Sequence, residues 1–261
     1  MTHKLTRTLI FAACSAVISI SPLAADNLGN YLTPIGGGAY DSNGTSFTDG
    51  DKTITFTFYS DTVTCNDPVH GAVACPTGVA SPTGPDALSI FASSVFSAPG
   101  LPSLEGFTLQ GTVQAQSEVD SFGNLESTTE DIALEYTVTA SAGLISDLHL
   151  GVGGASVTGA TSDPPEFTIG ESTNAPGAGS ISVTDPPPSF TDQINLPTPV
   201  SSLSVLKDIS LISGSGLGDQ ASFSVLTQSF SQVPEPRAYA AVLGLFLAAF
   251  FVIKRRRQQT A

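Results

Sequence analysis

The sequence predicts an all-β fold: an antiparallel β-sandwich ectodomain between an N-terminal signal peptide and one C-terminal transmembrane helix. Within residues 26–232, apolar side chains recur with a period of two, as in half-buried strands. Segment 52–59 is the clearest case, because Ile54, Phe56 and Phe58 alternate with threonines and so share one face of the pleat. Clusters of Gly and Pro separate such segments, and no soluble helix longer than two turns stands out. Short strands joined by many turns favour a sandwich, with a flatter barrel or irregular β-fold as the alternative.

The other strands follow in order along the chain. Residues 107–119 alternate between apolar and polar side chains, and residues 132–138 do the same after a turn-like stretch. We expect these two strands to pair as a long hairpin. Further strands are expected at 88–96, 145–152, 166–169, 180–184, 202–213 and 221–230. The proline run 186–188 is a possible boundary between subdomains, but the segment after it is short, so we treat 26–232 as one unit.

The first 25 residues have the three parts of a secretory signal peptide. Lys4 and Arg7 supply the positive region, residues 9–20 form an apolar stretch of 12 residues, and residues 22–25 form a small-residue cleavage zone. We expect cleavage after Ala25. The Sec translocon and signal peptidase are therefore expected partners, and the mature chain is expected to be exported.

The last 29 residues, 233–261, join a rigid motif, an apolar segment and a basic stop. The motif consists of Val233, Pro234, Glu235 and Pro236. Its two prolines keep it extended, because each fixes φ and disfavours helix at the residue before it. Residues 238–253 carry no charge and would span about 24 Å as a transmembrane helix. A basic tail at 254–257 then places this end in the cytoplasm; it consists of Lys254, Arg255, Arg256 and Arg257.

This ending resembles the PEP-CTERM sorting signal of Gram-negative bacteria that produce exopolysaccharide. The likeness covers the tail only and lies in the order of the three parts and in the Pro234-Glu235-Pro236 motif. It implies an exosortase, a membrane-embedded cysteine protease, as partner, and an inner-membrane precursor that is later delivered to the cell surface or matrix. Segments 207–209, 223–225 and 230–232 resemble the ends of PEP-CTERM proteins with uncharacterised β-rich ectodomains, which implies no activity. An ordinary single-pass anchor with an accidental motif is the alternative.

The predicted ectodomain is strongly acidic. Residues 26–232 contain two lysines, Lys52 and Lys207, no arginine and 22 Asp or Glu, which gives a formal charge of −20. Such a domain repels nucleic acid, so DNA and RNA are excluded as partners. Anionic polysaccharide and membrane surfaces are repelled as well, unless divalent cations bridge them. We expect Lys207 to be solvated or paired with Asp208.

Two cysteines, Cys65 and Cys75, remain after processing. An even number of cysteines in an exported chain predicts a disulfide, which here closes a small loop. A metal site assisted by His70 is the alternative, but two cysteines and one histidine lack a fourth ligand and match no zinc spacing. We therefore predict no metal and no cofactor at this position.

The sequence contains none of the familiar catalytic motifs. It has no G-x-S-x-G elbow, no H-E-x-x-H, no P-loop and no dinucleotide fingerprint. His70 and His149 are read as surface residues. Carboxylates are plentiful, but tryptophan is absent and aromatic platforms for sugar binding are not evident.

A calcium hypothesis concerns the oxygen-rich segment 41–51. Its possible ligands are Asp41, Asn43, Asp49 and Asp51. The segment departs from an EF-hand loop, because no bidentate Glu stands at its twelfth position. A turn leading into the strand at 52–59 is the alternative.

The sequence as a whole thus predicts an exported, non-catalytic protein of the cell surface or extracellular matrix, structural or adhesive in an exopolysaccharide biofilm. A secreted carbohydrate-binding module or hydrolase with the same sorting tag is the alternative. A groove lined by tyrosines, with two carboxylates facing each other, would favour that alternative.

Overall fold

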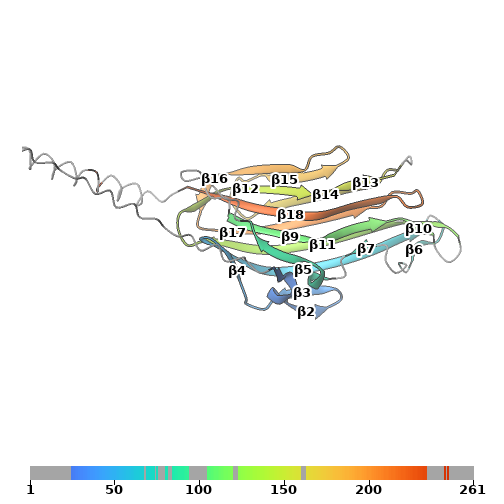
Figure 1. Cartoon of the computed structure of the whole chain (residues 1–261), viewed down its shortest axis with the longest axis horizontal. Coiled ribbons are helices and arrows are strands. Elements are labelled where there is room, and N and C mark those ends of the chain that lie inside the picture. Colours follow the sequence, from blue (N-terminus) through green and yellow to red (C-terminus); the bar gives the residue numbers. More distant parts are fainter. Residues whose placement is uncertain are drawn as a thin grey trace, which may run out of the picture.

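Two antiparallel β-sheets enclose one apolar core, which gives the sandwich-like all-β fold that the sequence predicts. The computed structural model describes residues 25–67, 69–73, 75, 80, 81, 84–93, 105–119, 123–159 and 163–233, together with Gly244 and Phe246. In Figure 1 the long strands of both sheets run along the long axis of the molecule.

The larger sheet has the strand order β15-β14-β17-β11-β5-β3-β2. In addition, β4 and β6 pair with β5, and β10 pairs with β11. The long strands β5, β11 and β17 lie at its centre. Their bounds and those of the shorter strands are β2 Leu32–Gly36, β3 Ala39–Ser42, β4 Phe47–Asp49, β5 Lys52–Asp67, β6 Gly71–Val73, β10 Glu118–Val119, β11 Leu125–Ala140, β14 Glu166–Thr173, β15 Ser180–Asp185 and β17 Ser202–Ile212.

The smaller sheet has the order β1-β8-β9-β18-β12-β16, with β7 beside β9 and β13 beside β18. Two short 3₁₀ helices, η1 (Leu28–Tyr31) and η2 (Pro85–Ala87), are the only helices among residues 25–233 that the structure describes. The strands are β1 Asp26–Asn27, β7 Ala80–Ser81, β8 Ser89–Ala92, β9 Glu105–Gln116, β12 Leu144–Gly153, β13 Ser156–Thr158, β16 Thr191–Val200 and β18 Gln220–Val233.

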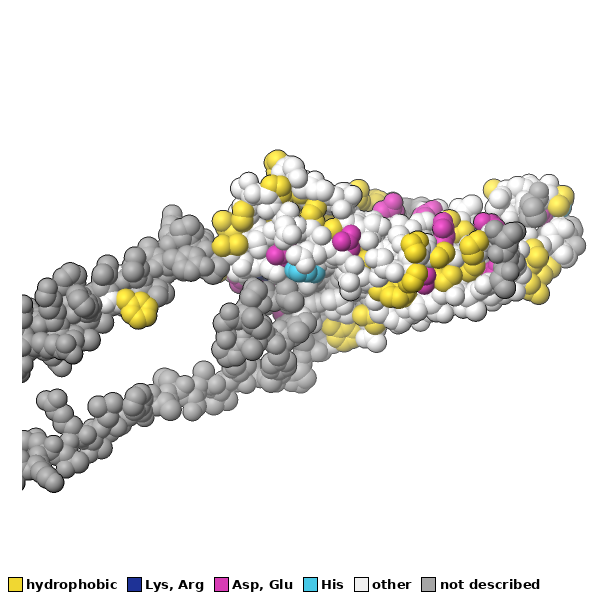
Figure 2. Space-filling model, turned by 90° about the horizontal axis from the view of Figure 1, so that it is seen from above, with side chains coloured by type: hydrophobic (Ala, Val, Ile, Leu, Met, Phe, Trp, Pro, Cys, Tyr) yellow, Lys and Arg dark blue, Asp and Glu magenta, His cyan; other side chains and the backbone are white. Residues whose placement is uncertain are grey.

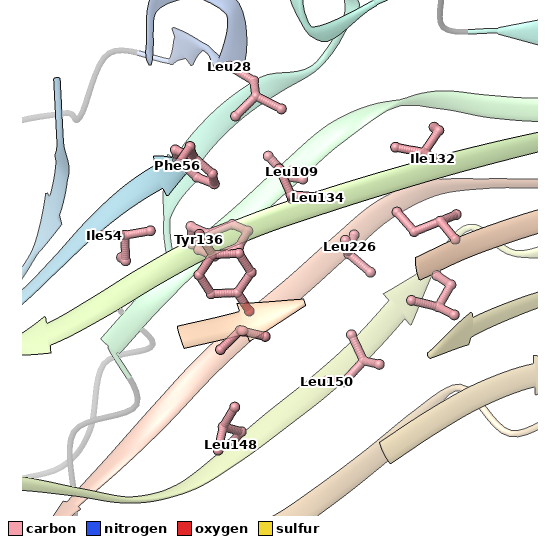
Figure 3. Packing of buried hydrophobic residues seen from close by; sticks show 14 of the residues in the cluster. Leu28, Ile54, Phe56, Leu109, Ile132, Leu134, Tyr136, Leu148, Leu150 and Leu226 are labelled. Atoms are coloured by element: carbon pink, nitrogen blue, oxygen red, sulfur yellow. The ribbon is translucent and has the colours of Figure 1, made fainter. Parts of the chain in front are cut away.

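Aromatic side chains join the two sheets across the core. The ring centroid of Phe107 of β9 lies 5.4 Å from that of Phe56 of β5 and 5.1 Å from that of Tyr136 of β11. The ring centroid of Tyr136 in turn lies 6.5 Å from that of Phe230 of β18. Figure 3 shows Tyr136 among buried aliphatic side chains of several strands. Because these rings come from both sheets, they fix the sheets face to face.

The expected hairpin between 107–119 and 132–138 is wrong. Strand β9 pairs with β8 and β18 in the smaller sheet, whereas β11 pairs with β5 and β17 in the larger one. Only the short β10 pairs with the start of β11. The apolar faces of β9 and β11 pack against each other across the core, so the chain changes sheets between them. Alternation alone shows which face of a strand is buried and says nothing about its neighbour in the sheet.

The expectation that Ile54, Phe56 and Phe58 share one buried face is also corrected. Ile54 and Phe56 are fully buried, but the next fully buried side chain is Tyr59, and Phe58 is only partly buried. The register explains this, because Glu135 pairs with Phe58 and its neighbour Tyr136 pairs with Phe56, which leaves Thr57 as an extra residue. This β-bulge shifts the alternation by one position.

Most of the other predicted strands are present, but β16 was not predicted. It begins soon after the proline run 186–188 and contains Pro197 and Pro199, residues that are rare inside sheets. Strand β16 lies at the edge of the smaller sheet, where missing N–H groups are tolerated. Residues Thr184 and Ser189 exchange backbone hydrogen bonds of 3.0 and 2.8 Å, so the proline run is a turn that leads from β15 toward β16.

Strand β18 serves here to name one end of the domain. This strand is 14 residues long, about 45 Å when extended, and lies between β9 and β12 for most of its length. We call the end at Val233 the base. In Figure 1 the base lies at the left.

The predicted signal peptide and the predicted C-terminal sorting signal lie largely outside the described residues. Residues 1–24 of the predicted signal peptide are not among them, nor are the predicted span 238–253, apart from Gly244 and Phe246, and the basic tail 254–257. No helix within the described part of the chain is long and apolar enough to cross a membrane.

Candidate functional site

The base of the domain holds the junction with the predicted sorting signal. Strand β18 continues to Val233, which pairs with Leu144 of β12, and Gln232 pairs with Ile145. Val233 is 41% exposed. The sheet therefore includes the first residue of the predicted motif, whereas Pro234, Glu235 and Pro236 lie outside the described residues.

A charged cluster fixes this junction to both sheets. The Gln232 side-chain amide donates hydrogen bonds to Asp51 Oδ1 and, at 3.3 Å, to Glu105 Oε2. Lys52 Nζ, fully buried, lies 2.6 Å from Asp51 Oδ1 and 3.3 Å from Glu105 Oε2. The cluster thus joins β5 of the larger sheet to β9 and β18 of the smaller one.

The two carboxyl groups of this cluster differ in their pKa. Burial alone would raise the pKa of Asp51, but hydrogen bonding with Glu105 and the contact with Lys52 hold it below its usual value. Burial raises the pKa of Glu105, and hydrogen bonding with Asp51 raises it further. The lysine charge is therefore balanced mainly by Asp51.

The predicted disulfide is confirmed. Cys65 of β5 and Cys75 are bridged, with their Cα atoms 5.1 Å apart, and Cys65 is fully buried. Within this loop His70 Nδ1 lies 2.5 Å from Asp67 Oδ2. The hydrogen bond with His70, together with those from nearby backbone N–H groups, lowers the pKa of Asp67 to about 2. His70 is thus a turn-stabilising partner of Asp67 in the structure.

The four possible calcium ligands are not brought together. Asp41 lies opposite Phe58, whereas Asp49 lies opposite Lys52, six residues away on the same strand β5, which corresponds to about 20 Å. Asp49 Oδ2 accepts a 2.9 Å hydrogen bond from Gly106 N, and Asn43 Oδ1 accepts one of 2.8 Å from Thr45 N. Among the described residues, no group of three or more His, Cys, Asp or Glu is arranged to hold a metal ion.

His149 lies beside Asp147 and Ser231, but not as a catalytic relay. Its Nε2 atom is 2.9 Å from Asp147 Oδ1 and 3.2 Å from Ser231 Oγ. A relay needs the carboxylate on one ring nitrogen and the hydroxyl on the other. Since both partners here share one nitrogen, His149 cannot take a proton from Ser231 while Asp147 orients the ring. The three residues form a surface hydrogen-bond network.

An open groove of about 620 Å³ runs along the outer face of β12, β16 and β18. Its lining is rich in hydrogen-bonding groups, and Gly151 leaves its floor without a side chain. It is lined by His149, Leu150, Gly151, Thr191, Asp192, Gln193, Asn195, Thr227 and Ser229. Gln193 donates to Asn195 at 3.2 Å, so the two amides are held side by side. This groove was not predicted from the sequence, because β16, which forms part of it, was not predicted.

No tyrosine lines this groove. Tyr31, Tyr59 and Tyr136 are buried in the core, and Tyr40 packs against the Tyr59 ring at 5.9 Å. This groove is therefore not the tyrosine-lined groove that would favour a hydrolase or an aromatic sugar-binding platform. Sugar binding in the groove would rest on polar side chains.

The prediction that Lys207 is solvated or paired with Asp208 is wrong. Lys207 is fully buried and pairs with Glu171, which lies directly opposite on β14 and is itself buried. Asp208 points to the other face of β17, because neighbouring residues of a strand alternate. Both lysines of residues 26–232 are therefore inside the protein, and this span exposes no Lys or Arg side chain. Figure 2 shows one face of the domain with acidic side chains in magenta and no basic ones.

Comparisons with known proteins identify no family. No family model matches the chain, and no curated protein sequence matches it. One similar solved structure is that of TmCBM61 in complex with beta-1,4-galactotriose, with 11% sequence identity and a TM-score of 0.25. The match covers 57% of this chain and 83% of that one. At this TM-score the likeness says nothing about the ligand of this chain.

Proposed function

We propose that this chain is an exported, non-catalytic protein that an exosortase processes at the motif 233–236. The released ectodomain acts at the cell surface or in the exopolysaccharide matrix, where its role is structural or adhesive. Before processing, the C-terminal segment 238–253 anchors the precursor in the inner membrane.

The observation that carries this proposal is that β18 reaches Val233, the first residue of the motif. Val233 pairs with Leu144 of β12, and the side chain of Gln232 is held by Asp51 and Glu105. Cleavage after Val233 would therefore leave every described strand and every described buried residue in the released part. A folded domain whose described strands all precede the rest of the motif suits release from a membrane anchor.

The charge of the surface limits its partners. With both lysines buried, the exposed ionisable side chains of the described part of 26–232 are mainly carboxylates. Anionic polymers are repelled by such a surface unless divalent cations bridge the two. Neutral polysaccharide, or anionic polysaccharide in the presence of divalent cations, is thus the favoured matrix partner.

Cell fractionation tests the sorting proposal. The double variant Pro234→Ala/Pro236→Ala should accumulate as an unprocessed precursor in the inner membrane, because alanines let the helix extend outward through the motif. Pro34→Ala is the matched control, since Pro34 is exposed on strand β2 at the edge of the larger sheet, whereas β18 belongs to the smaller sheet, and this variant should be processed normally. Normal release of the double variant would contradict the proposal.

Carbohydrate binding in the groove is the second candidate function. The paired amides of Gln193 and Asn195 beside Asp192 and His149 offer donors and acceptors that suit sugar hydroxyls. Gln193→Ala and Asn195→Ala should abolish binding of the exported protein to neutral polysaccharide in a pull-down assay. Thr137→Ala and Ser204→Ala, in a polar depression on the opposite sheet, serve as controls. Equal binding by all four variants would exclude the groove.

A further inference from the structure

Lys207, Glu171 and Gln228 form a closed triad inside the sandwich. Lys207 Nζ donates hydrogen bonds to Glu171 Oε2 and, at 2.9 Å, to Gln228 Oε1. Gln228 Nε2 donates a hydrogen bond of 3.1 Å to Glu171 Oε1. The carboxylate of Glu171 thus contacts an amine through one oxygen and a carboxamide nitrogen through the other.

The three residues come from both sheets and are sealed from solvent. Glu171 of β14 and Lys207 of β17 belong to the larger sheet, and Gln228 of β18 belongs to the smaller one. All three are at most 3% exposed. The neighbouring inward positions on β17 and β18 are apolar, namely Val205, Ile209, Leu226 and Phe230.

The burial of Lys207 acts against the charged form of its amine. Burial lowers the pKa of Lys207, although the charge of Glu171 and its hydrogen bond act in the opposite direction. A neutral lysine amine is a nucleophile, whereas an ammonium group is not. Water, the usual competitor for an acyl carbon, is excluded from this part of the core.

We propose that Lys207 and Gln228 react to form an intramolecular amide bond that links the two sheets. The uncharged Lys207 Nζ attacks the Gln228 side-chain carbonyl carbon, a new N–C bond forms, and the attacking nitrogen then gives one proton to the Glu171 carboxylate. The bond between that carbon and Nε2 breaks, and the nitrogen leaves as ammonia after receiving a proton from Glu171. The step releases one ammonia and needs no oxidant, metal or second substrate.

Glu171 is placed to carry the proton in both halves of this step. One of its oxygens contacts the nucleophile and the other contacts the leaving group, so a proton taken from the amine can be returned to the departing nitrogen. The Tyr136 hydroxyl, which has no hydrogen-bond partner among the described residues, lies close enough to Glu171 to sense its charge. Burial raises the pKa of Tyr136, so this hydroxyl remains a donor in the same region of the core.

An ordinary buried ion pair would need only Lys207 and Glu171. The third member distinguishes this site, because Gln228 supplies an acyl carbon next to the amine and a leaving group next to the carboxylate. Lys52 has no such arrangement: its amine contacts Asp51 and Glu105, which are partly exposed, and no amide carbonyl oxygen accepts from it in the described structure. The inference does not depend on the sorting proposal.

Mass spectrometry of the folded full-length protein tests the proposal. After reduction of the disulfide, the intact mass should fall short of the sequence mass by one ammonia. Trypsin should no longer cleave after Lys207, so residues 53–207 and 208–237 should remain joined, and tandem spectra should place the link at Lys207 and Gln228. A full sequence mass with cleavage after Lys207 would overturn the proposal.

Variants separate the cross-link from other losses of ammonia. Glu171→Gln, Lys207→Met and Gln228→Leu should each restore the full mass of the variant sequence. Lys52→Arg, at the other buried lysine, should retain the deficit. If Glu171→Gln keeps the deficit at Lys207 and Gln228, the role of Glu171 is wrong. If a variant does not fold, the peptide map of the unaltered protein still decides whether the bond exists.

Discussion

Glu171 and Lys207 lie directly opposite each other on β14 and β17, and both side chains are buried inside the sandwich. Removing Lys207 leaves the buried Glu171 carboxyl group without its partner, and it also removes the proposed link to Gln228. Lys207→Met should therefore lower the free energy of unfolding by about 3–5 kcal/mol. The double variant Lys207→Met/Glu171→Leu should be more stable than Lys207→Met in urea denaturation. A double variant less stable than both single variants would argue against this dependence of Glu171 on Lys207.

Asp61 gives the stability of the domain a pH dependence near neutrality. Burial raises the pKa of Asp61 to about 6, and a hydrogen bond from Gly84 N opposes the shift only in part. The unfolded chain has the ordinary pKa of about 3.9, so between these values the folded state binds more protons. The free energy of unfolding should thus rise as the pH falls from 7 to 5. Asp61→Asn should flatten that slope in pH-dependent thermal melts, and an unchanged slope would contradict the assignment.

The Cys65–Cys75 bridge should contribute about 2–3 kcal/mol to the free energy of unfolding, as expected for a disulfide that closes a short loop. The double variant Cys65→Ala/Cys75→Ala should show this loss in chemical denaturation, and the exported protein should show no reactive thiol when it is labelled under denaturing conditions. Two reactive thiols in the mature protein would contradict an oxidised bridge.

Divalent cations should act on the domain through its overall charge. Because the possible ligands in 41–51 are separated along β5, Mg²⁺ and Ca²⁺ should raise the melting temperature gradually and to a similar extent. Asp41→Ala, at an exposed position, should leave this response unchanged. A saturable effect specific for Ca²⁺ that Asp41→Ala abolishes would show a true calcium site.

The alternation of apolar residues was sufficient to predict the fold class and most long strands. The alternation did not predict which strands pair. Strands β9 and β11 would show the same alternation if they were hydrogen-bonded neighbours in one sheet or if they packed against each other from opposite sheets. The bulge at Thr57 was not predicted either. One extra residue reverses which positions of the strand face the core, and the composition of the strand does not reveal it. Strand β16 was missed because its prolines suggest a loop.

The buried triad did have a signal in the sequence. Lys207 stands between Val205 and Ile209, Gln228 between Leu226 and Phe230, and Glu171 follows Phe167 and Ile169 at the same period of two. A polar residue at an apolar position of an alternating strand indicates a buried polar group that needs a partner. Which residues would meet could not be predicted, because β14, β17 and β18 are brought together only by the sandwich.

Mass spectrometry of the C terminus of the protein recovered from the cell surface or matrix tests the sorting account most directly. We predict a mature chain that ends within or next to the motif 233–236 and contains none of residues 238–253. Such a chain would stay folded, because it would keep all the strands that the structure describes, β18 to Val233 included. Recovered protein that retains residues 243–253 would contradict the account and would indicate a permanent single-pass anchor.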